Sequence, residues 1–275
     1  MNNISMVFCT TDSYSDTWNP FFTLLKKHWH DFDMPIYFCS DSASYSYEGF
    51  DIRCPMQGKS YKKRPSWSKL LYDTLKHVNT EYIFFILDDF WLTDDVDVNK
   101  FQYCLNTMKE DKKIGYICLA GYKTGMLNDG TNRAILCEYD GLLEVTKKCL
   151  WRIHAQAGIW RVKYLKKILK KSEDAWQFEW NGTVRSRFLL SKCYDVIDPV
   201  IKYPFNGVIT RGKVIEEYFN LYSEEYYKPL LEKREILKKG DECIVPVKRI
   251  SLWIRILSRI RPSAKIASNL GQHCK

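Results

Sequence analysis

The chain has 275 residues, long enough for one large α/β domain or two small ones, and its 45% hydrophobic content supports a sizeable core. Of the formal net charge of +9, +7 lies beyond Glu242, where no acidic residue follows, so the rest of the chain carries only +2. This distribution argues against a nucleic-acid-binding face spread over the domain and places a basic patch at one end.

Strands and helices alternate in the first part of the chain. Short apolar runs predict strands over residues 5–9, 34–40 and 50–54. Apolar residues at spacings of three and four predict amphipathic helices over 17–29 and 66–78. Strands and helices at this spacing predict an α/β fold with a Rossmann-like, mostly parallel central sheet flanked by helices.

Polar residues follow the first predicted strand and precede the second helix. Thr10, Thr11 and Asp12 form a hydroxyl-rich end to the first strand. Ser66 can cap the helix that follows a basic loop, which leaves Lys69 in the first turn of that helix. A lysine at this position opposes the helix dipole, so it is either simply solvated or held by an anion.

The apolar run 82–87 ends in two adjacent carboxylates, Asp88 and Asp89. Its aromatic and β-branched residues predict a strand buried on both faces. Carboxylates at the end of such a strand are costly unless a cation lies nearby, and open α/β sheets bind ligands beyond the carboxyl ends of their strands. The pair indicates a bound cation or a ligand that carries one. The alternative is a strand end whose two aspartates cap a turn.

Later elements continue the alternation. A helix is expected near 98–108, a strand over 114–119 and a helix over 162–171. The stretch 120–141 is rich in Gly, Asn, Asp and Lys, which predicts a long loop or a hairpin insertion.

Two later segments carry candidate site residues. The stretch 154–161 combines small residues with Trp160, so it could let a ligand approach the backbone while the indole stacks on a sugar. In the segment 172–182 three carboxylates alternate with three aromatic residues, and acids in such surroundings can serve as general bases. The alternative is that Glu173 and Asp174 cap the N-terminus of a helix. His154 could be a further metal ligand, but a lone histidine among apolar residues is more often structural, and it is interpreted as such.

These features together resemble the GT-A-fold glycosyltransferases of bacterial surface polysaccharide synthesis (capsule, lipopolysaccharide or exopolysaccharide). The resemblance rests on the Rossmann-like first half, the Asp88-Asp89 pair, the Gln-Ala-Gly-Ile-Trp of 156–160 and the Glu-Asp-Ala-Trp-Gln-Phe-Glu of 173–179. It spans roughly residues 4 to 220. Phe90 stands where a strict Asp-x-Asp element has its second aspartate.

The resemblance implies a donor site for a nucleotide sugar. Asp89 would ligate Mn²⁺ or Mg²⁺, and Asp88 would contact the ribose or the metal shell. The Arg-Gly-Lys of 211–213 would close over the diphosphate. The implied donor-binding residues are Thr10, Thr11, Asp12, Trp67, Lys69, Asp88, Arg211 and Lys213.

The resemblance also implies an acceptor site and a catalytic base. Glu173 matches the candidate base of an inverting single displacement, with Asp174 as the fallback. The implied acceptor-binding residues are Gln156, Gly158, Trp160, Trp176 and Glu179.

The end of the chain predicts a membrane-associating segment. Residues 250–260 place apolar residues, including Trp253, on one helical stripe with arginines at its flanks, a pattern typical of helices that lie in anionic lipid. The alternative is a terminal helix packed on the domain with a solvated basic face. We therefore expect a domain over 1–245, a basic amphipathic tail over 246–275, and a glycan or glycolipid acceptor at the membrane surface.

Cysteine usage and the N-terminus bear on the compartment. None of the ten cysteines forms a CxxC pair, and Cys9, Cys39 and Cys118 lie in apolar runs where a free thiol behaves as a core residue. Residues 1–4 begin no signal sequence, and no apolar segment approaches spanning length. The expected location is the cytoplasm, peripherally at the inner face of the cell membrane.

The expected function is transfer of a sugar from a nucleotide donor to a hydroxyl of a growing, lipid-linked glycan. A sugar nucleotidyltransferase is the nearest enzymatic alternative, but residues 9–13 lack the glycine-rich phosphate loop that it would normally show. A non-catalytic glycan- or lipid-binding module is the alternative from another class.

Overall fold

The computed structural model describes residues 3–121, 134–149 and 151–238. One compact unit covers Met1–Ile236 and a second covers Leu237–Lys275, most of which lies outside the described residues. The amphipathic helix predicted within 246–275 lies outside them as well. No helix of the described part is both long and apolar enough to cross a membrane.

Nine strands of the described chain form one sheet in the order β3-β2-β1-β4-β8-β5-β9-β7-β6. Their bounds are β1 Ile4–Cys9, β2 Ile36–Cys39, β3 Ile52–Arg53, β4 Tyr82–Leu87, β5 Ile114–Cys118, β6 Ala134–Leu136, β7 Leu142–Val145, β8 Gly158–Arg161 and β9 Lys192–Val196. Strands β1 to β4 are mutually parallel, and β5 is parallel to β9. Within this sheet only β7 and β8 run in the opposite direction. The mostly parallel α/β sheet expected from the sequence is confirmed.

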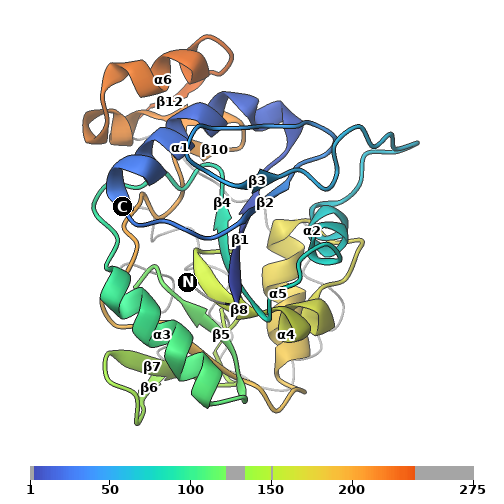
Figure 1. Ribbon diagram of the computed structural model, residues 1–275, viewed down its shortest axis with the longest axis vertical. Coiled ribbons are helices and arrows are strands. Elements are labelled where there is room, and N and C mark those ends of the chain that lie inside the picture. Colours follow the sequence, from blue (N-terminus) through green and yellow to red (C-terminus); the bar gives the residue numbers. More distant parts are fainter. Residues whose placement is uncertain (1–2, 122–133, 150, 239–275) are drawn as a thin grey trace. The chain divides into compact units, whose positions relative to one another are not determined.

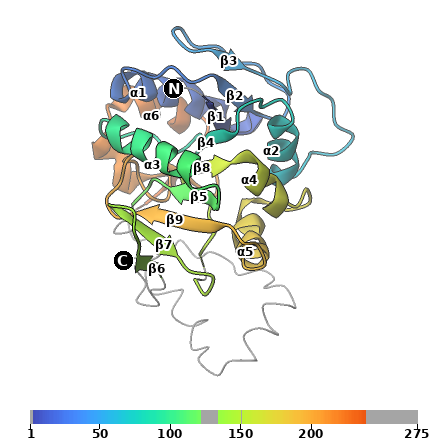
Figure 2. The ribbon, with the colours of Figure 1, turned by 60° about the horizontal axis from the view of Figure 1, so that its bottom comes forward.

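Helices cover both faces of this sheet (Figure 2). Their bounds are α1 Ser15–His28, α2 Trp67–Leu75, α3 Val98–Glu110, α4 Val162–Ile168, α5 Ala175–Ser186 and α6 Glu224–Leu231. Helices α1 and α3 pack on one face, while α2, α4 and α5 pack on the other (Figures 1 and 2). A small sheet contains β10 Ile209–Thr210, β11 Lys213–Ile215 and β12 Ile236–Leu237. Two 3₁₀ turns, η1 Asp12–Tyr14 and η4 Glu216–Leu221, complete the elements used below.

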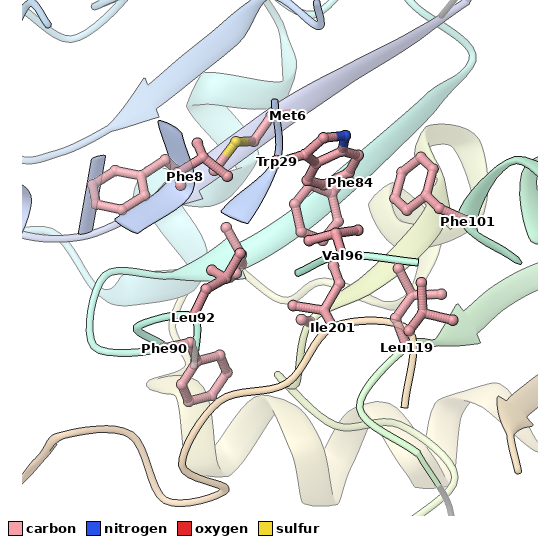
Figure 3. Packing of buried hydrophobic residues seen from close by; sticks show 14 of the residues in the cluster. Met6, Phe8, Trp29, Phe84, Phe90, Leu92, Val96, Phe101, Leu119 and Ile201 are labelled. Atoms are coloured by element: carbon pink, nitrogen blue, oxygen red, sulfur yellow. The ribbon is translucent and has the colours of Figure 1, made fainter. Parts of the chain in front are cut away.

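The two-residue period of the central strands divides their side chains between two cores. In β4, Phe84 joins the core under α1 and α3, whereas its neighbour Phe85 joins the core under α2, α4 and α5. Figure 3 shows the first core, where the Trp29 ring centroid lies 5.7 Å from that of Phe84 and 4.9 Å from that of Phe101. Burying one such ring contributes about 1.5–3 kcal/mol, so the uninterrupted apolar run fixes β4 in the middle of the sheet.

Most predicted elements are present within a few residues of their expected ends. The long loop or hairpin expected over 120–141 corresponds in part to the β6–β7 hairpin, and residues 122–133 lie outside the described chain. Several elements were not predicted. Residues 158–161, interpreted as a ligand-facing stretch, form β8 between β4 and β5, and β9, α6 and the small sheet were not expected either. The predicted core thiols Cys9, Cys39 and Cys118 are all buried and free.

Candidate active site

The carboxyl ends of β1 and β4 lie side by side at one edge of the sheet. Cys9 and Leu87 are register partners at the ends of these parallel strands, so Thr10 and Asp88 leave the sheet together. The hydroxyl of Thr10 donates a hydrogen bond to Oδ2 of Asp88, and Trp18 Nε1 donates to Thr10 Oγ1 at 2.7 Å. Asp88 is 7% exposed, and burial raises its pKa to about 7. The first half of the aspartate pair is therefore held in place by Thr10 and Trp18.

Asp89 is held against the backbone of a later loop. Its main-chain oxygen accepts a hydrogen bond from the N–H of Val208 at 2.9 Å, and its side chain faces Gly207. Oδ1 of Asp89 is buried and has no hydrogen-bond partner among the described residues. Burial, followed by the adjacent charge of Asp88, raises the pKa of Asp89 well above its usual value. A buried, unpartnered carboxylate oxygen next to a second carboxylate fits a divalent cation that prefers oxygen ligands.

A buried arginine supplies positive charge near this pair. Arg234 donates two hydrogen bonds to Asp16, at 2.7 and 2.8 Å, and lies 4.3 Å from the centroid of the Tyr14 ring. The two side chains of the ion pair are 8% and 1% exposed. Arg234 opposes the rise in the pKa of both Asp88 and Asp89 that burial causes. The sequence offered no motif for this arginine, which comes from the far end of the compact unit.

The turn predicted to close over a diphosphate is a tight hairpin next to Arg234. Arg211 and Gly212 have φ values of +52° and +79° between the paired residues Thr210 and Lys213, which is the geometry of a two-residue hairpin loop. Arg234 Nη1 donates to the carbonyl oxygen of Gly212 at 3.4 Å. Arg211 is exposed, while Nζ of Lys213 forms an ion pair with Glu235 at 2.7 Å. The turn is thus tied to the buried ion pair.

Four of the predicted donor-site residues near β1 and α2 already have protein partners. The carboxylate of Asp12 accepts hydrogen bonds from the backbone N–H groups of residues 41, 42 and 43, which ties the loop after β2 to the loop after β1. Lys69 forms an ion pair with Asp73 one turn later in α2. The ring of Trp67 packs 5.4 Å from that of Phe178. Thr11 Oγ1 lies 2.9 Å from Ser13 Oγ.

The N-terminus of α5 holds the two candidate bases in different ways. Asp174 is exposed and caps the helix: its Oδ1 accepts from the N–H of Gln177 at 2.7 Å, and the Gln177 side chain accepts from the N–H of Asp174. Glu173 is buried and accepts two hydrogen bonds from Arg185, at 2.8 and 2.6 Å, and one from Asn181 at 2.9 Å. Asp174 caps the helix and, being exposed, is still compatible with a role as the base. The carboxylate of Glu173 is instead held in an ion pair with Arg185.

Helix α5 begins next to the start of α2. The Ser66 hydroxyl donates to the carbonyl oxygen of Lys171 at 2.5 Å, and the Ser68 N–H donates to that of Glu173 at 3.1 Å. Because α2 follows β3, its N-terminus lies at the carboxyl edge of the parallel strands. The candidate base and the Asp88-Asp89 pair therefore belong to the same edge of the sheet.

Of the predicted acceptor residues, Trp176 is exposed, whereas Trp160 and Gly158 are packed in the hydrophobic core. Trp176 is 52% exposed, whereas Trp160 is 1% exposed and stacks on Tyr116 with ring centroids 3.8 Å apart. A Cβ on Gly158 would lie 2.6 Å from a Tyr116 ring carbon and 2.8 Å from the carbonyl oxygen of Ile117. Packing between β8 and β5 accounts for the glycine, and the Trp160 ring presents no face to solvent.

Gln156 and Glu179 are polar side chains buried at the same edge. Glu179 accepts a hydrogen bond from the N–H of Ala155 at 2.7 Å, and burial raises its pKa to about 7. Gln156 Oε1 accepts from the Tyr203 hydroxyl at 2.9 Å. The Tyr203 ring stacks on Phe90, with centroids 4.4 Å apart, and so joins Gln156 to the residue that follows the aspartate pair. Tyr203 was not predicted as a site residue.

No known family of protein sequences and no curated protein matches this chain. Among solved structures, S. aureus TarS 1-349 in complex with UDP has a TM-score of 0.48 at 13% identity, over 80% of this chain and 63% of that chain. The WbbM bifunctional glycosyltransferase has a TM-score of 0.42 at 9% identity, over 88% of this chain and 46% of that chain. The bifunctional IspDF from Campylobacter jejuni has a TM-score of 0.43 at 12% identity, over 81% of this chain and 55% of that chain. The chain spans 60% of a second structure of TarS 1-349 and 36% of a structure of the longer TarS chain.

Proposed function

We propose that the chain is a GT-A-type glycosyltransferase that moves a sugar from a nucleoside-diphosphate donor to a hydroxyl acceptor. The observation that carries this proposal is the Asp88-Asp89 pair at the carboxyl end of β4, in which one carboxylate oxygen, Oδ1 of Asp89, is buried and has no partner among the described residues. A carboxylate oxygen in such a position is costly unless a ligand or cation satisfies it. The carboxyl edge of a parallel sheet is also where a nucleotide is bound in such folds.

The donor would bind between the strand ends and the hairpin turn. Asp89, with Asp88 beside it, would hold Mn²⁺ or Mg²⁺ together with diphosphate oxygens and water. The cation, when bound, neutralises charge that builds on the leaving diphosphate. Arg211, exposed on the hairpin, is free to approach a diphosphate, and Lys213 could exchange its exposed partner Glu235 for the same anion. Thr10, Thr11 and the loop that Asp12 tethers would line the nucleoside side.

The chemical step is proposed as a single displacement with a carboxylate base. The acceptor oxygen forms a bond to the anomeric carbon, the bond from that carbon to the diphosphate oxygen breaks, and the base takes the hydroxyl proton. Asp174 is the better of the two predicted bases because its carboxylate is exposed, whereas Arg185 and Asn181 hold that of Glu173. Glu173 would then position the start of α5 rather than accept the proton.

The proposed acceptor is a glycan or glycolipid. Exposed Trp176 lies two residues after Asp174, in the first turn of α5, and could stack on an acceptor sugar. Buried Gln156 and Glu179 would contact the transferred sugar or position the backbone around it. The apolar stripe predicted over residues 250–260, with arginines at its flanks, supports an acceptor embedded in an anionic membrane surface, at the inner face of the cell membrane.

Release of nucleoside diphosphate from a panel of nucleotide sugars, in the presence of Mn²⁺ or Mg²⁺, tests this function. We expect turnover of at least one donor by the wild type and a loss of roughly 10²-fold or more in Asp89→Asn. Exposed Asp140 provides a surface control, since Asp140→Asn should turn over the donor at the wild-type rate. Pyrophosphate release from a nucleoside triphosphate and a sugar phosphate would instead identify a nucleotidyltransferase. Absence of turnover in every assay would favour a binding module.

A further inference from the structure

A second group of chemically reactive side chains lies at the same sheet edge, on the strands beyond β4. Cys118 ends β5, Asp195 lies near the end of β9, and His154 precedes β8. One possible ligand atom from each residue (the Cys Sγ, a His ring nitrogen and a carboxylate oxygen) lies within 4.8 Å of the other two. All three residues are buried, at 1%, 5% and 3% exposure. None of them belongs to the aspartate pair or to the predicted base.

One polar atom of this cluster has no hydrogen-bond partner among the described residues. Oδ1 of Asp195 is buried and has no hydrogen-bond partner among the described residues. A hydrogen bond with the Cys118 thiol engages the Asp195 carboxylate, but a buried carboxylate oxygen left without a partner still costs about 1–3 kcal/mol unless a proton or a cation satisfies it. The thiol and the imidazole next to it are both good metal ligands, so a cation would use all three groups at once.

The backbone holds the three residues on rigid elements. Cys118 and Asp195 are register partners on the adjacent parallel strands β5 and β9, so their side chains leave the sheet in the same direction. Cys118 is also the register partner of Gly158 on β8, four residues after His154. The hydroxyl of Tyr116 lies 3.2 Å from Nδ1 of His154 and so orients the imidazole ring. Metal-binding histidines commonly carry such a second hydrogen bond.

We propose that Cys118, His154 and Asp195 form a zinc site distinct from the Asp88-Asp89 pair. A set with one sulfur, one nitrogen and one oxygen ligand suits Zn²⁺, whereas Mg²⁺ and Mn²⁺ prefer oxygen ligands alone. A thiolate and a carboxylate together balance the two positive charges of the ion. Three protein ligands leave one position of a tetrahedral shell for water or a substrate hydroxyl. The site is inferred from these side chains alone and does not depend on the proposed transferase activity.

Metal content of the purified full-length chain is the direct test. The chain is incubated with Zn²⁺ and Mn²⁺ together, passed through a desalting column and analysed by mass spectrometry of the metals. We expect about one zinc ion per chain in the wild type and in Asp89→Asn, and a loss of most of that zinc in Cys118→Ser and His154→Ala. A wild type without retained zinc would overturn the proposal.

Cys193→Ser is the matched control, because Cys193 is a fully buried thiol on β9 outside the cluster. This variant should keep its zinc. If it loses as much zinc as Cys118→Ser, the loss reflects general destabilisation and the proposed ligand set is wrong.

Cobalt provides a readout that does not depend on zinc stoichiometry. Addition of Co²⁺ to the metal-free wild type should produce a thiolate-to-cobalt charge-transfer absorption, which Cys118→Ser should lack. Tyr116→Phe should keep this absorption but raise the dissociation constant for the metal by roughly 10-fold, because the His154 ring loses its second hydrogen bond. Persistence of the absorption in Cys118→Ser would show that another cysteine binds the metal.

Discussion

The side chain of Asp89 lies directly against the Cα of Gly207, so that a Cβ on Gly207 would stand 2.2 Å from Oδ2 and 2.5 Å from Cγ of Asp89. Gly207 also has a φ of +73°, which side chains other than glycine rarely adopt. The loop at Gly207 therefore fixes how far the Asp89 carboxylate can move.

Gly207→Ala should displace the Asp89 carboxylate and lower both stability and the proposed activity. Gly212→Ala is the control, since Gly212 has a similar φ of +79° but no atom within 4 Å of an added Cβ. Both variants carry the strain of a positive φ, roughly 1 kcal/mol or more, so the difference between them isolates the contact with Asp89. Urea denaturation should show Gly207→Ala to be less stable than Gly212→Ala by at least about 1 kcal/mol. An equal loss of stability in the two variants would show that the Asp89 side chain moves away from an added Cβ at little cost.

Arg234→Met should be strongly destabilising because it leaves the Asp16 carboxylate buried without its cation. Loss of one partner of a buried ion pair costs about 3–5 kcal/mol, and Asp16→Asn in the same chain should recover a part of that loss. Lys213→Met removes an exposed ion pair with Glu235 and should change the free energy of unfolding by less than about 1 kcal/mol. If the double variant Arg234→Met/Asp16→Asn is no more stable than Arg234→Met alone, the proposed energetic coupling between Arg234 and Asp16 is contradicted.

Stability should depend on pH through Glu179. Burial raises its pKa to about 7 from an ordinary value of 4.5. The bound proton therefore contributes stability that is fully present below pH 4.5 and is lost as the pH rises through 7. Glu179→Gln keeps the acceptor for the Ala155 N–H but cannot ionise, so its stability relative to the wild type should rise over this window, by at most about 3 kcal/mol. If the stability of the wild type and of Glu179→Gln changes with pH in the same way, Glu179 does not keep its proton in the folded state.

Asp174→Asn separates capping from catalysis at the start of α5. Asparagine caps helices about as well as aspartate, so the stability should change by less than about 0.5 kcal/mol, while removal of the base should lower transfer by roughly 10²- to 10⁴-fold. Glu173→Gln should show the opposite pattern, with a clear loss of stability because Arg185 loses its charged partner. Full activity in Asp174→Asn would exclude it as the base.

The sequence was informative wherever local pattern decides the structure. The apolar run of 82–87 allowed both β4 and the position of the aspartate pair to be predicted, because only a central strand accepts such a run. The cap of α2 by Ser66 follows from the same local logic. The capping interpretation of Asp174, left open from the sequence, is present in the structure.

Contacts between distant residues could not be predicted from pattern. The ion pair between Arg234 and Asp16 joins residues 218 positions apart, and neither stands in a recognisable motif. Trp160 next to small residues suggested a sugar-stacking surface, but the small residue Gly158 serves to bring β8 against Tyr116. The Cys118, His154 and Asp195 cluster depends on strand order, which a single sequence does not reveal.

Calorimetric titration of the full chain with UDP and with GDP, each in the presence of Mn²⁺, tests the central claim most directly. The wild type and the surface control Asp140→Asn should bind at least one of the two nucleotides with the same affinity, and Asp89→Asn should bind it at least about tenfold more weakly. Absence of binding of either nucleotide to the wild type, or equal binding by Asp89→Asn, would contradict the assignment of the Asp88-Asp89 edge as a nucleotide-sugar site.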